Sequence, residues 1–333
     1  MRFSGPAGLG EMSNIQGAAP LDLEQNRLAA IFSKFGIHIF LVALIVISGI
    51  VSPAFLSPNN ISNMLLQAAP LGIVVIGQAF VLILRGFDLS VGSIMATAAV
   101  MTTGFSGQDS DVAMITLISI AIGVATGLVN GLLVTKRDVS PFLATLATMI
   151  VLQGFRFAYT QGAPSGNVPP FFRIIGSQTL YGIPYNLLLM AGLALIFGVL
   201  LAKSKFGREV YITGGNPTAA RLLGINADRV TILGYVISGG LAAIAGLALS
   251  GYVGIVDNWV GRGFELDSIV AAVMGGIALT GGRGTILGGL TGAAIIVVIF
   301  NAVLLFGLPV QLQIIIKGLV IVTAAAFYVR RGA

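Results

Sequence analysis

The sequence predicts an all-α polytopic membrane protein, and three observations support that prediction. The 333 residues have a mean hydropathy of +0.98, and 9% of them are charged, against about 25% in soluble domains. Apolar runs long enough to cross a bilayer follow one another from residue 35 onward. The chain also contains 45 glycines, whose small size permits the close helix packing that membrane interiors require.

Turn residues and charged loops divide the apolar runs into about ten expected transmembrane helices. These spans are residues 35–52, 62–84, 90–104, 112–134, 141–160, 186–202, 231–251, 266–279, 285–306 and 311–329. In the third helix of each of two four-helix groups, glycines recur every four residues and form a packing face of small residues. They are Gly123, Gly127 and Gly131 in one group and Gly284, Gly288 and Gly292 in the other. Spans 2–5 and 7–10 are therefore expected to form an inverted repeat.

The distribution of Lys and Arg predicts the orientation of the chain. Residues 1–34 are polar and lack the early apolar core of a secretory signal, so we expect a cytoplasmic N-terminal tail. Residues 35–333 are the transmembrane domain. With the tail inside, the loop holding Lys136 and the longest basic loop, residues 203–230, also lie in the cytoplasm, as the positive-inside rule requires. An even number of spans places both termini there.

The composition excludes several classes of function. The chain has no cysteine, and a single histidine, His38, cannot build a metal centre by itself. No lysine follows a glycine as in a nucleotide-binding P-loop, and no Ser–His–Asp set is possible around an isolated apolar histidine. The net charge of +6 is spread over short loops, so membrane orientation explains it better than nucleic-acid binding does. We therefore expect neither an enzyme nor a bound cofactor or metal.

The segment GGNPTAARLLGI, residues 214–225, has the pattern of a short capped helix inside the basic loop 203–230. Asn216 is a typical N-cap, Pro217 takes the first helical position, and Gly224 ends the turn. A helix of about seven residues is not stable alone in water. It therefore either fits a groove on a cytosolic partner or packs on the membrane domain of its own chain. The motif residues are Gly214, Gly215, Asn216, Pro217, Ala219, Ala220, Arg221, Leu222 and Gly224.

The segment RGFDLSVGS, residues 85–93, places a carboxylate between two apolar runs. An aspartate near mid-membrane costs roughly 2.5–3.5 kcal/mol on insertion scales and normally faces a cavity or a partner. Asp88 is interpreted either as the cap of the next helix or as part of a broken helix that lines a transport pathway. The residues expected to line such a pathway are Gln67, Gln78, Phe87, Asp88 and Ser90.

The loop DNWVGRGFELD, residues 257–267, lies on the side opposite the basic loop. Its candidate functional residues are Trp259, Arg262, Glu265 and Asp267. They are expected at the outer mouth, where they contact a docked partner. Alternatively, the two carboxylates cap the following helix.

The cytoplasmic motif resembles one found in the permease subunits of bacterial ABC importers for monosaccharides, the ribose/xylose/galactose type. Members of that family carry Gly-Gly-Asn, an alanine and then Arg-Leu-x-Gly-Ile-Asn, which appear here between Gly214 and Asn226. They also carry Gly-Gly-Ile-Asp-Leu-Ser-Val-Gly-Ser. This chain departs from that pattern with Arg85 and Phe87, where the family usually has a small residue and isoleucine.

Two further blocks extend the resemblance from about residue 50 to the C-terminus. One is a Glu-Leu-Asp-x-Ile-Ala-Ala-Val-x-x-Gly-Gly pattern, whose matching residues here are Glu265, Leu266, Asp267, Ile269, Ala271, Ala272, Val273, Gly275 and Gly276. The other is an Asn-Gly pair followed by a proline and Thr-Leu, seen here from Asn130 to Leu146. Only the N-terminal tail lies outside the resemblance.

The resemblance implies the permease subunit of an ATP-driven importer in the bacterial inner membrane, surrounded by lipid. Two permeases, identical or different, would act with cytosolic ATPase subunits docked on Pro217–Leu223 and with a sugar-binding protein outside. The spans contain few basic residues, which fits a neutral monosaccharide or polyol as the substrate. Phe87 either stacks on this substrate or simply packs nearby. The alternatives are an ion-coupled secondary transporter without an ATPase, which would need paired intramembrane carboxylates, and a membrane scaffold without transport.

Overall fold

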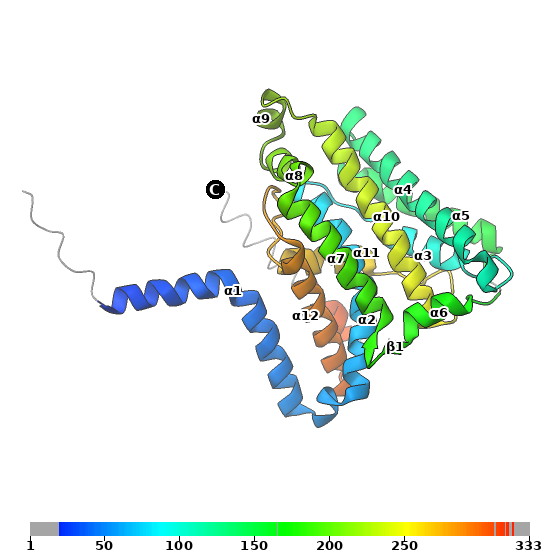
Figure 1. The fold of residues 1–333 in the computed structure, drawn as a ribbon, viewed down its shortest axis with the longest axis horizontal. Helices are drawn as coiled ribbons and strands as arrows, with labels where there is room; N and C mark the ends of the chain where they lie inside the picture. The colour runs from blue at the N-terminus through cyan, green and yellow to red at the C-terminus, as the bar shows by residue number, and fades with distance from the viewer. Residues whose placement is uncertain (1–19, 165, 310, 317, 320–321, 323–333) are drawn as a thin grey trace, which may run out of the picture.

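The structure, a computed structural model, describes residues 20–309 except 165, together with residues 311–316, 318–319 and 322. Helices dominate this part of the chain, and one two-stranded antiparallel ribbon accompanies them (Figure 1). The elements are α1 Pro20–Val51, η1 Pro53–Leu56, α2 Pro58–Ile83, α3 Ser90–Met101, η2 Asp109–Asp111, α4 Val112–Lys136, α5 Pro141–Thr160, α6 Pro170–Ser177, β1 Thr179–Leu180, β2 Ile183–Pro184, α7 Tyr185–Lys203, α8 Lys205–Gly215, α9 Pro217–Leu222, α10 Ala227–Val253, α11 Phe264–Met274 and α12 Ile286–Leu305.

Six helices in the described part of the chain are long and apolar enough to cross a membrane, namely α2, α4, α5, α7, α10 and α12. The all-α polytopic class is thereby confirmed, whereas the count of ten spans stays a prediction. The expected span 90–104 is only the 12-residue α3, about 18 Å at 1.5 Å per residue, so it cannot cross alone. Much of the expected span 311–329 lies outside the described residues.

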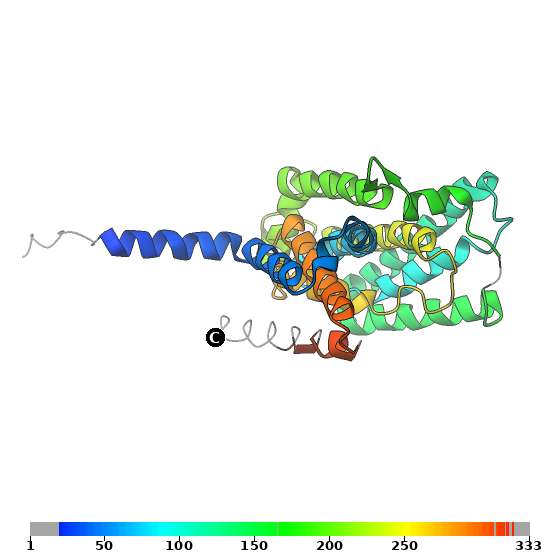
Figure 2. The same ribbon diagram turned by 90° about the horizontal axis from the view of Figure 1, so that it is seen from below.

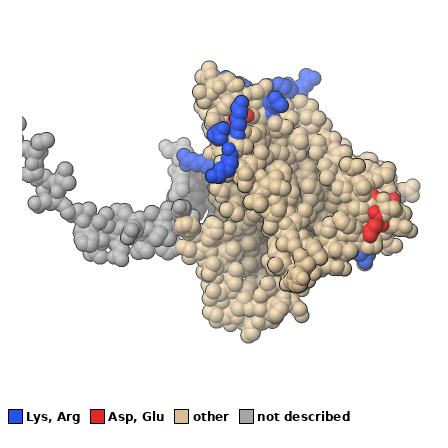
Figure 3. All heavy atoms as spheres, viewed as in Figure 1, with Lys and Arg blue, Asp and Glu red and all other residues tan. Residues whose placement is uncertain are grey.

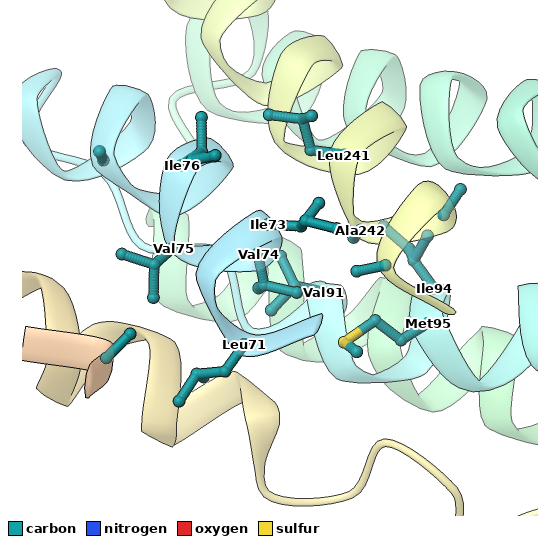
Figure 4. Close-up of a cluster of buried hydrophobic side chains, with 14 of the residues drawn as sticks. Leu71, Ile73, Val74, Val75, Ile76, Val91, Ile94, Met95, Leu241 and Ala242 are labelled. Carbon is teal, nitrogen blue, oxygen red and sulfur yellow. The ribbon is translucent and has the colours of Figure 1, made fainter. Parts of the chain in front are cut away.

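Two long helices, α2 and α10, form the centre of the molecule. In α2, 89% of the most apolar window is buried, against 17% in α5 and 11% in α7, which therefore lie on the outside of the helix bundle. Figure 2 shows α7 on one side and α5 on the other, with α2 and α10 between them. The hydrophobic core includes a cluster of buried side chains where α2, α3 and α10 meet (Figure 4). Its labelled side chains are Leu71, Ile73, Val74, Val75, Ile76, Val91, Ile94, Met95, Leu241 and Ala242.

The first glycine stripe confirms its expected role as a packing face. The stripe of α4 lies directly on α10: Gly123 meets the carbonyl of Gly239, and Gly127 meets that of Tyr235. The second stripe is only partly helical. Gly288 and Gly292 pack α12 against α11, but Gly284 lies in the preceding loop with φ +136°. A residue with a side chain rarely adopts that backbone angle, so Gly284 serves a turn rather than a helix face.

The halves expected to form an inverted repeat share one visible feature. A long helix, α2 or α10, is followed by a short one, α3 or α11, and each short helix packs on the long helix of the other half. This arrangement is compatible with the inverted repeat, which stays a prediction.

The basic residues gather at one end of the molecule, around α8, α9 and the start of α10 (Figure 3). The exposed basic side chains at this basic end are Lys136, Arg137, Lys203, Lys205, Arg208, Arg221 and Arg229. The loop that follows α10 lies at the opposite end, because α10 starts beside α9 and runs for 27 residues.

Candidate functional site

A buried carboxylate occupies the break between α2 and α3. Asp88 is fully buried, and one of its oxygens, Oδ1, accepts hydrogen bonds from the backbone N–H of Ser90 at 3.0 Å and from the Ser90 hydroxyl at 2.5 Å. The other oxygen, Oδ2, accepts one from the hydroxyl of Ser238 on α10, at 2.7 Å. Asp88 therefore accepts a hydrogen bond from the first N–H of α3, although the N-cap position itself is Leu89, and it also joins the break to α10.

The Asp88 contacts extend into a polar network that links four helices. The amide of Asn130 on α4 donates to the hydroxyl of Ser90 at 2.9 Å. The hydroxyl of Thr148 on α5 donates to the carbonyl oxygen of Asn130 at 2.8 Å. Since buried polar groups must find partners, this polar network fixes the relative positions of α3, α4, α5 and α10.

The structure brings only part of the expected pathway set together. Asp88 and Ser90 are in direct contact, and the carbonyl of Phe87 accepts a hydrogen bond from the Tyr235 hydroxyl at 3.3 Å. Phe87 itself packs against the hydrophobic core. Gln78 is fully buried on α2, and its amide has no hydrogen-bond partner among the described residues. Gln67 lies three turns away on the same helix and is exposed. Whether these residues line a pathway stays a prediction.

The break after α2 is tied to the basic end by one arginine. Arg85 Nε donates to the carbonyl of Gly214 at 2.6 Å, and its Nη2 donates to the carbonyl of Gly215. Both carbonyls belong to the last turn of α8, where they have no partner within the helix. A cation at a helix C-terminus is also favoured by the helix dipole.

A glycine-rich turn, residues 281–284, completes this junction. The backbone N–H of Gly282 donates to the carbonyl of Ile83 at 2.8 Å, and the Tyr211 hydroxyl on α8 donates to that of Gly284 at 2.8 Å. Burial raises the pKa of Tyr211, so this hydroxyl remains a donor at neutral pH. A Cβ at Gly214 or Gly281 would collide with the surrounding backbone. The end of α2, the end of α8 and residues 281–284 thus form one closely packed junction.

The helix α9 has the capping that its sequence predicts. Asn216 Oδ1 accepts hydrogen bonds from the backbone N–H groups of Thr218 and Ala219, both at 3.0 Å. Gly224 has φ +77° and ends the helix. One face of α9 packs on the chain, since Ala220 is fully buried. The other face carries Leu222 and Leu223, which are 86% and 70% exposed.

One ion pair joins α9 to the start of α10, and a second joins the end of α4 to the same aspartate. Arg221 and Lys136 approach the two oxygens of Asp228 at 2.9 Å and 2.7 Å. The Arg221 side chain therefore attaches α9 to α10 and does not belong to the free face of α9. The two interpretations of this helix are therefore compatible: it packs on its own chain and still presents two free leucines.

The candidate residues of the opposite end lie in and after the loop 254–263. Trp259 is half exposed and Arg262 is exposed, with its guanidinium 5.0 Å from the centre of the Trp259 ring. Glu265 is half-buried and accepts a hydrogen bond from the Gly263 N–H at 3.0 Å. Asp267 is nearly buried. Contact of these residues with a partner stays a prediction.

The sequence interpretation missed one charged residue. Arg156 is buried in α5, where its Nη1 donates to the carbonyl of Ser93 at 2.9 Å. The signal was present, because a basic residue inside an apolar run is costly and normally functional. Metal binding has no support in the described ranges, which contain no group of three or more His, Cys, Asp or Glu side chains that could hold a metal ion.

Buried polar groups between broken helices, and a rigid appendage at a basic end, define a membrane transport component. The chain matches the family model "Branched-chain amino acid transport system / permease component" over residues 60–325, and it belongs to this family. No solved structure gives a significant match.

Curated relatives are similar over almost their whole length. Ribose import permease protein RbsC of Bacillus subtilis is 37% identical over 317 residues, covering 94% of this chain and 98% of the relative. Galactose/methyl galactoside import permease protein MglC of Haemophilus influenzae is 34% identical, covering 91% and 96%. The chain is thus a transport permease, which favours the importer over the ion-coupled alternative.

Proposed function

We propose that the chain forms the translocation pathway of an ATP-driven importer for a neutral monosaccharide or a related polyol. The names of its relatives, which are ribose and galactose import permeases, support this substrate class. A second permease copy or a related permease, and a sugar-binding protein at the end opposite α9, complete the assembly that we propose. The basic end faces the cytoplasm, as the positive-inside rule favours, and both termini lie on that side.

The exposed pair Leu222–Leu223 carries the proposal. Leu222 and Leu223 are large apolar side chains that lie exposed beside the charged residues of the basic end, outside the long apolar helices, which favours a protein partner that covers them. The helix is held by its cap, by buried Ala220 and by the Arg221–Asp228 pair. A rigid knob of this kind loses little conformational entropy on docking. We infer that the cytosolic ATPase subunit binds here.

Co-purification with an ATPase subunit tests the docking. We expect Leu222→Asp combined with Leu223→Asp to abolish capture of a co-expressed sugar-importer ATPase, because two charges would be buried at the contact. Ile255→Asp is the matched control, since Ile255 is 88% exposed at the opposite end. Capture that survives the double substitution, with the variant inserted in the membrane, would contradict docking on α9.

A further inference from the structure

A cavity of about 390 Å³ lies between α3, α5, the loop 254–263 and the start of α11. This volume is within the range of about 300–1,000 Å³ typical of small-molecule sites. Seven polar or aromatic side chains line it: Ser93, Gln153, Arg156, Asn258, Trp259, Arg262 and Glu265. Such a concentration of polar groups is unusual in a chain that is 56% apolar, and it lies on the half of the molecule away from α9.

Two of the lining side chains have buried polar atoms without a partner in the described part of the chain. Arg156 is 4% exposed, and its Nε donor is unpaired although Nη1 and Nη2 reach the carbonyls of Ser93 and Asn258. Asn258 is 2% exposed, and its Oδ1 acceptor is unpaired although its amide donates to Thr160 and Gly162. Both atoms are themselves buried, so a ligand that bears hydroxyl groups, which can donate and accept, reaches them when these two lining side chains turn toward the cavity.

An aromatic ring supplies an apolar surface in the same cavity. Trp259 is 50% exposed, and its ring contacts the Phe157 ring in a T-shaped arrangement with 5.5 Å between the ring centroids. Indole combines a flat apolar face with an N–H donor. A sugar ring has the matching character, since its C–H face is apolar and its rim carries hydroxyls.

Glu265 supplies hydrogen-bond acceptors at the wall of this cavity. It reaches across the cavity to Gly92 at the start of α3, where any larger residue would displace it. Arg156 already donates to two backbone carbonyls, and Arg262 lies over the Trp259 ring. A ligand with hydroxyl groups therefore finds acceptors on Glu265 and donors on Gln153 and Arg262 in one cavity.

We propose that this outer cavity is a binding subsite for an uncharged polyhydroxylated ligand of monosaccharide size. Gln153, Arg156, Asn258 and Glu265 supply hydrogen bonds, and Trp259 supplies the apolar contact. The inference rests on the proposed import of a neutral sugar and adds the residues that hold it. It assigns Trp259 and Glu265 to the ligand rather than to a docked protein.

The single tryptophan of the sequence provides a direct probe. The full chain in lipid nanodiscs is titrated with D-ribose and D-galactose while Trp259 emission is recorded, and D-gluconate serves as the anionic comparison. We expect a saturable change with at least one neutral sugar and none with D-gluconate. A saturable response to D-gluconate alone would overturn the proposal. The absence of a saturable response to any of the three compounds would also overturn it.

Substitutions in the cavity tie the response to its lining. Gln153→Ala and Gly92→Ala, the second of which displaces Glu265, should each weaken the apparent affinity about tenfold, as the loss of about one good hydrogen bond does. Gln178→Ala, an exposed glutamine outside the cavity, should leave the affinity unchanged. Equal affinity in all four proteins would overturn the subsite.

Capture of the ATPase distinguishes a failure of the proposed subsite from a failure of the proposed function. The cavity variants should still bind the ATPase, which shows that they are folded. A chain that binds the ATPase and drives sugar uptake, but gives no Trp259 response, loses the subsite and keeps the proposed function. A chain that binds no ATPase loses the proposed function itself.

Discussion

Arg85 Nε lies 2.6 Å from the carbonyl oxygen of Gly214, and this hydrogen bond joins the break after α2 to the last turn of α8. Asp88 follows Arg85 by three residues, and α9 begins three residues after Gly214. The junction is packed without room for a Cβ at Gly214 or Gly281, so it transmits a displacement instead of absorbing it. We therefore expect movement of α9 to reach the buried polar network through Arg85.

Replacing Arg85 should uncouple the two ends of this connection. Arg85→Ala removes two charge-assisted hydrogen bonds, each worth about 1.5–3 kcal/mol, and should lower ATP-driven uptake at least about tenfold while the ATPase still binds. Arg85→Lys should be intermediate, because an ammonium lacks the fork that reaches two carbonyls. Arg137→Ala, an exposed arginine at the basic end, is the control. Unchanged uptake in Arg85→Ala would remove Arg85 from the coupling.

Removing the Asp88 carboxylate should destabilise the fold. Asp88→Ala leaves the buried hydroxyls of Ser90 and Ser238 without their acceptor, at about 1–3 kcal/mol for each unsatisfied group. The apparent melting temperature in detergent should fall by several degrees. Glu209→Ala, which breaks only the surface pair with Lys205, should change it little. Equal melting temperatures for the two variants would show that the polar network contributes little.

Two helical glycines offer a matched test of the α4–α10 contact. Gly127→Ala places a methyl group against the Tyr235 carbonyl and should lower the apparent melting temperature. Gly154→Ala on α5 meets nothing within 4 Å and should leave the melting temperature unchanged or raise it. Differential scanning fluorimetry compares them directly. A similar shift in both variants would mean that α4 does not depend on close approach.

The absence of cysteine from the sequence makes the orientation measurable without background labelling. We expect Leu223→Cys to react with a membrane-impermeant maleimide only in inside-out vesicles. Ile255→Cys, at the opposite end, should react only in intact cells from which the outer membrane barrier has been removed. Both residues are largely exposed, so failure to react reflects sidedness rather than burial. The reverse pattern would overturn the cytoplasmic placement of α9.

The structure also shows which substitutions do not test docking. Arg221 is bound to Asp228, and Ala220 is fully buried, so changing either disturbs the attachment of α9 to its own chain. Substitution of Leu222 or Leu223 leaves this attachment intact, because their side chains are largely exposed.

Local signals predicted local structure well. The Asn216–Pro217 cap predicted a helix start that the structure reproduces, and the expected span 141–160 coincides with α5. The four-residue glycine repeat of α4 predicted a close contact, although not its partner α10. The shortness of α3 was not predicted, because the expected span was extended through Thr102, Thr103 and Gly104, which the structure places in a turn after Met101.

Contacts between distant segments left no such signal. Arg85 and Gly214 are 129 residues apart, and nothing in either motif states that they meet. The polar network also depends on Asn130 and Thr148, which look in sequence like ordinary span residues. The outer cavity combines α3, α5 and the loop after α10, so its lining emerges only from the packing of those elements.

Uptake of radiolabelled ribose or galactose into proteoliposomes tests the central claim most directly. The vesicles contain this chain with a sugar-importer ATPase, with the matching binding protein and ATP supplied on opposite sides. We predict uptake that requires ATP and that disappears in the Leu222→Asp, Leu223→Asp protein but not in Arg137→Ala. Uptake that proceeds without the ATPase, driven by an ion gradient, would contradict the account and favour a secondary transporter.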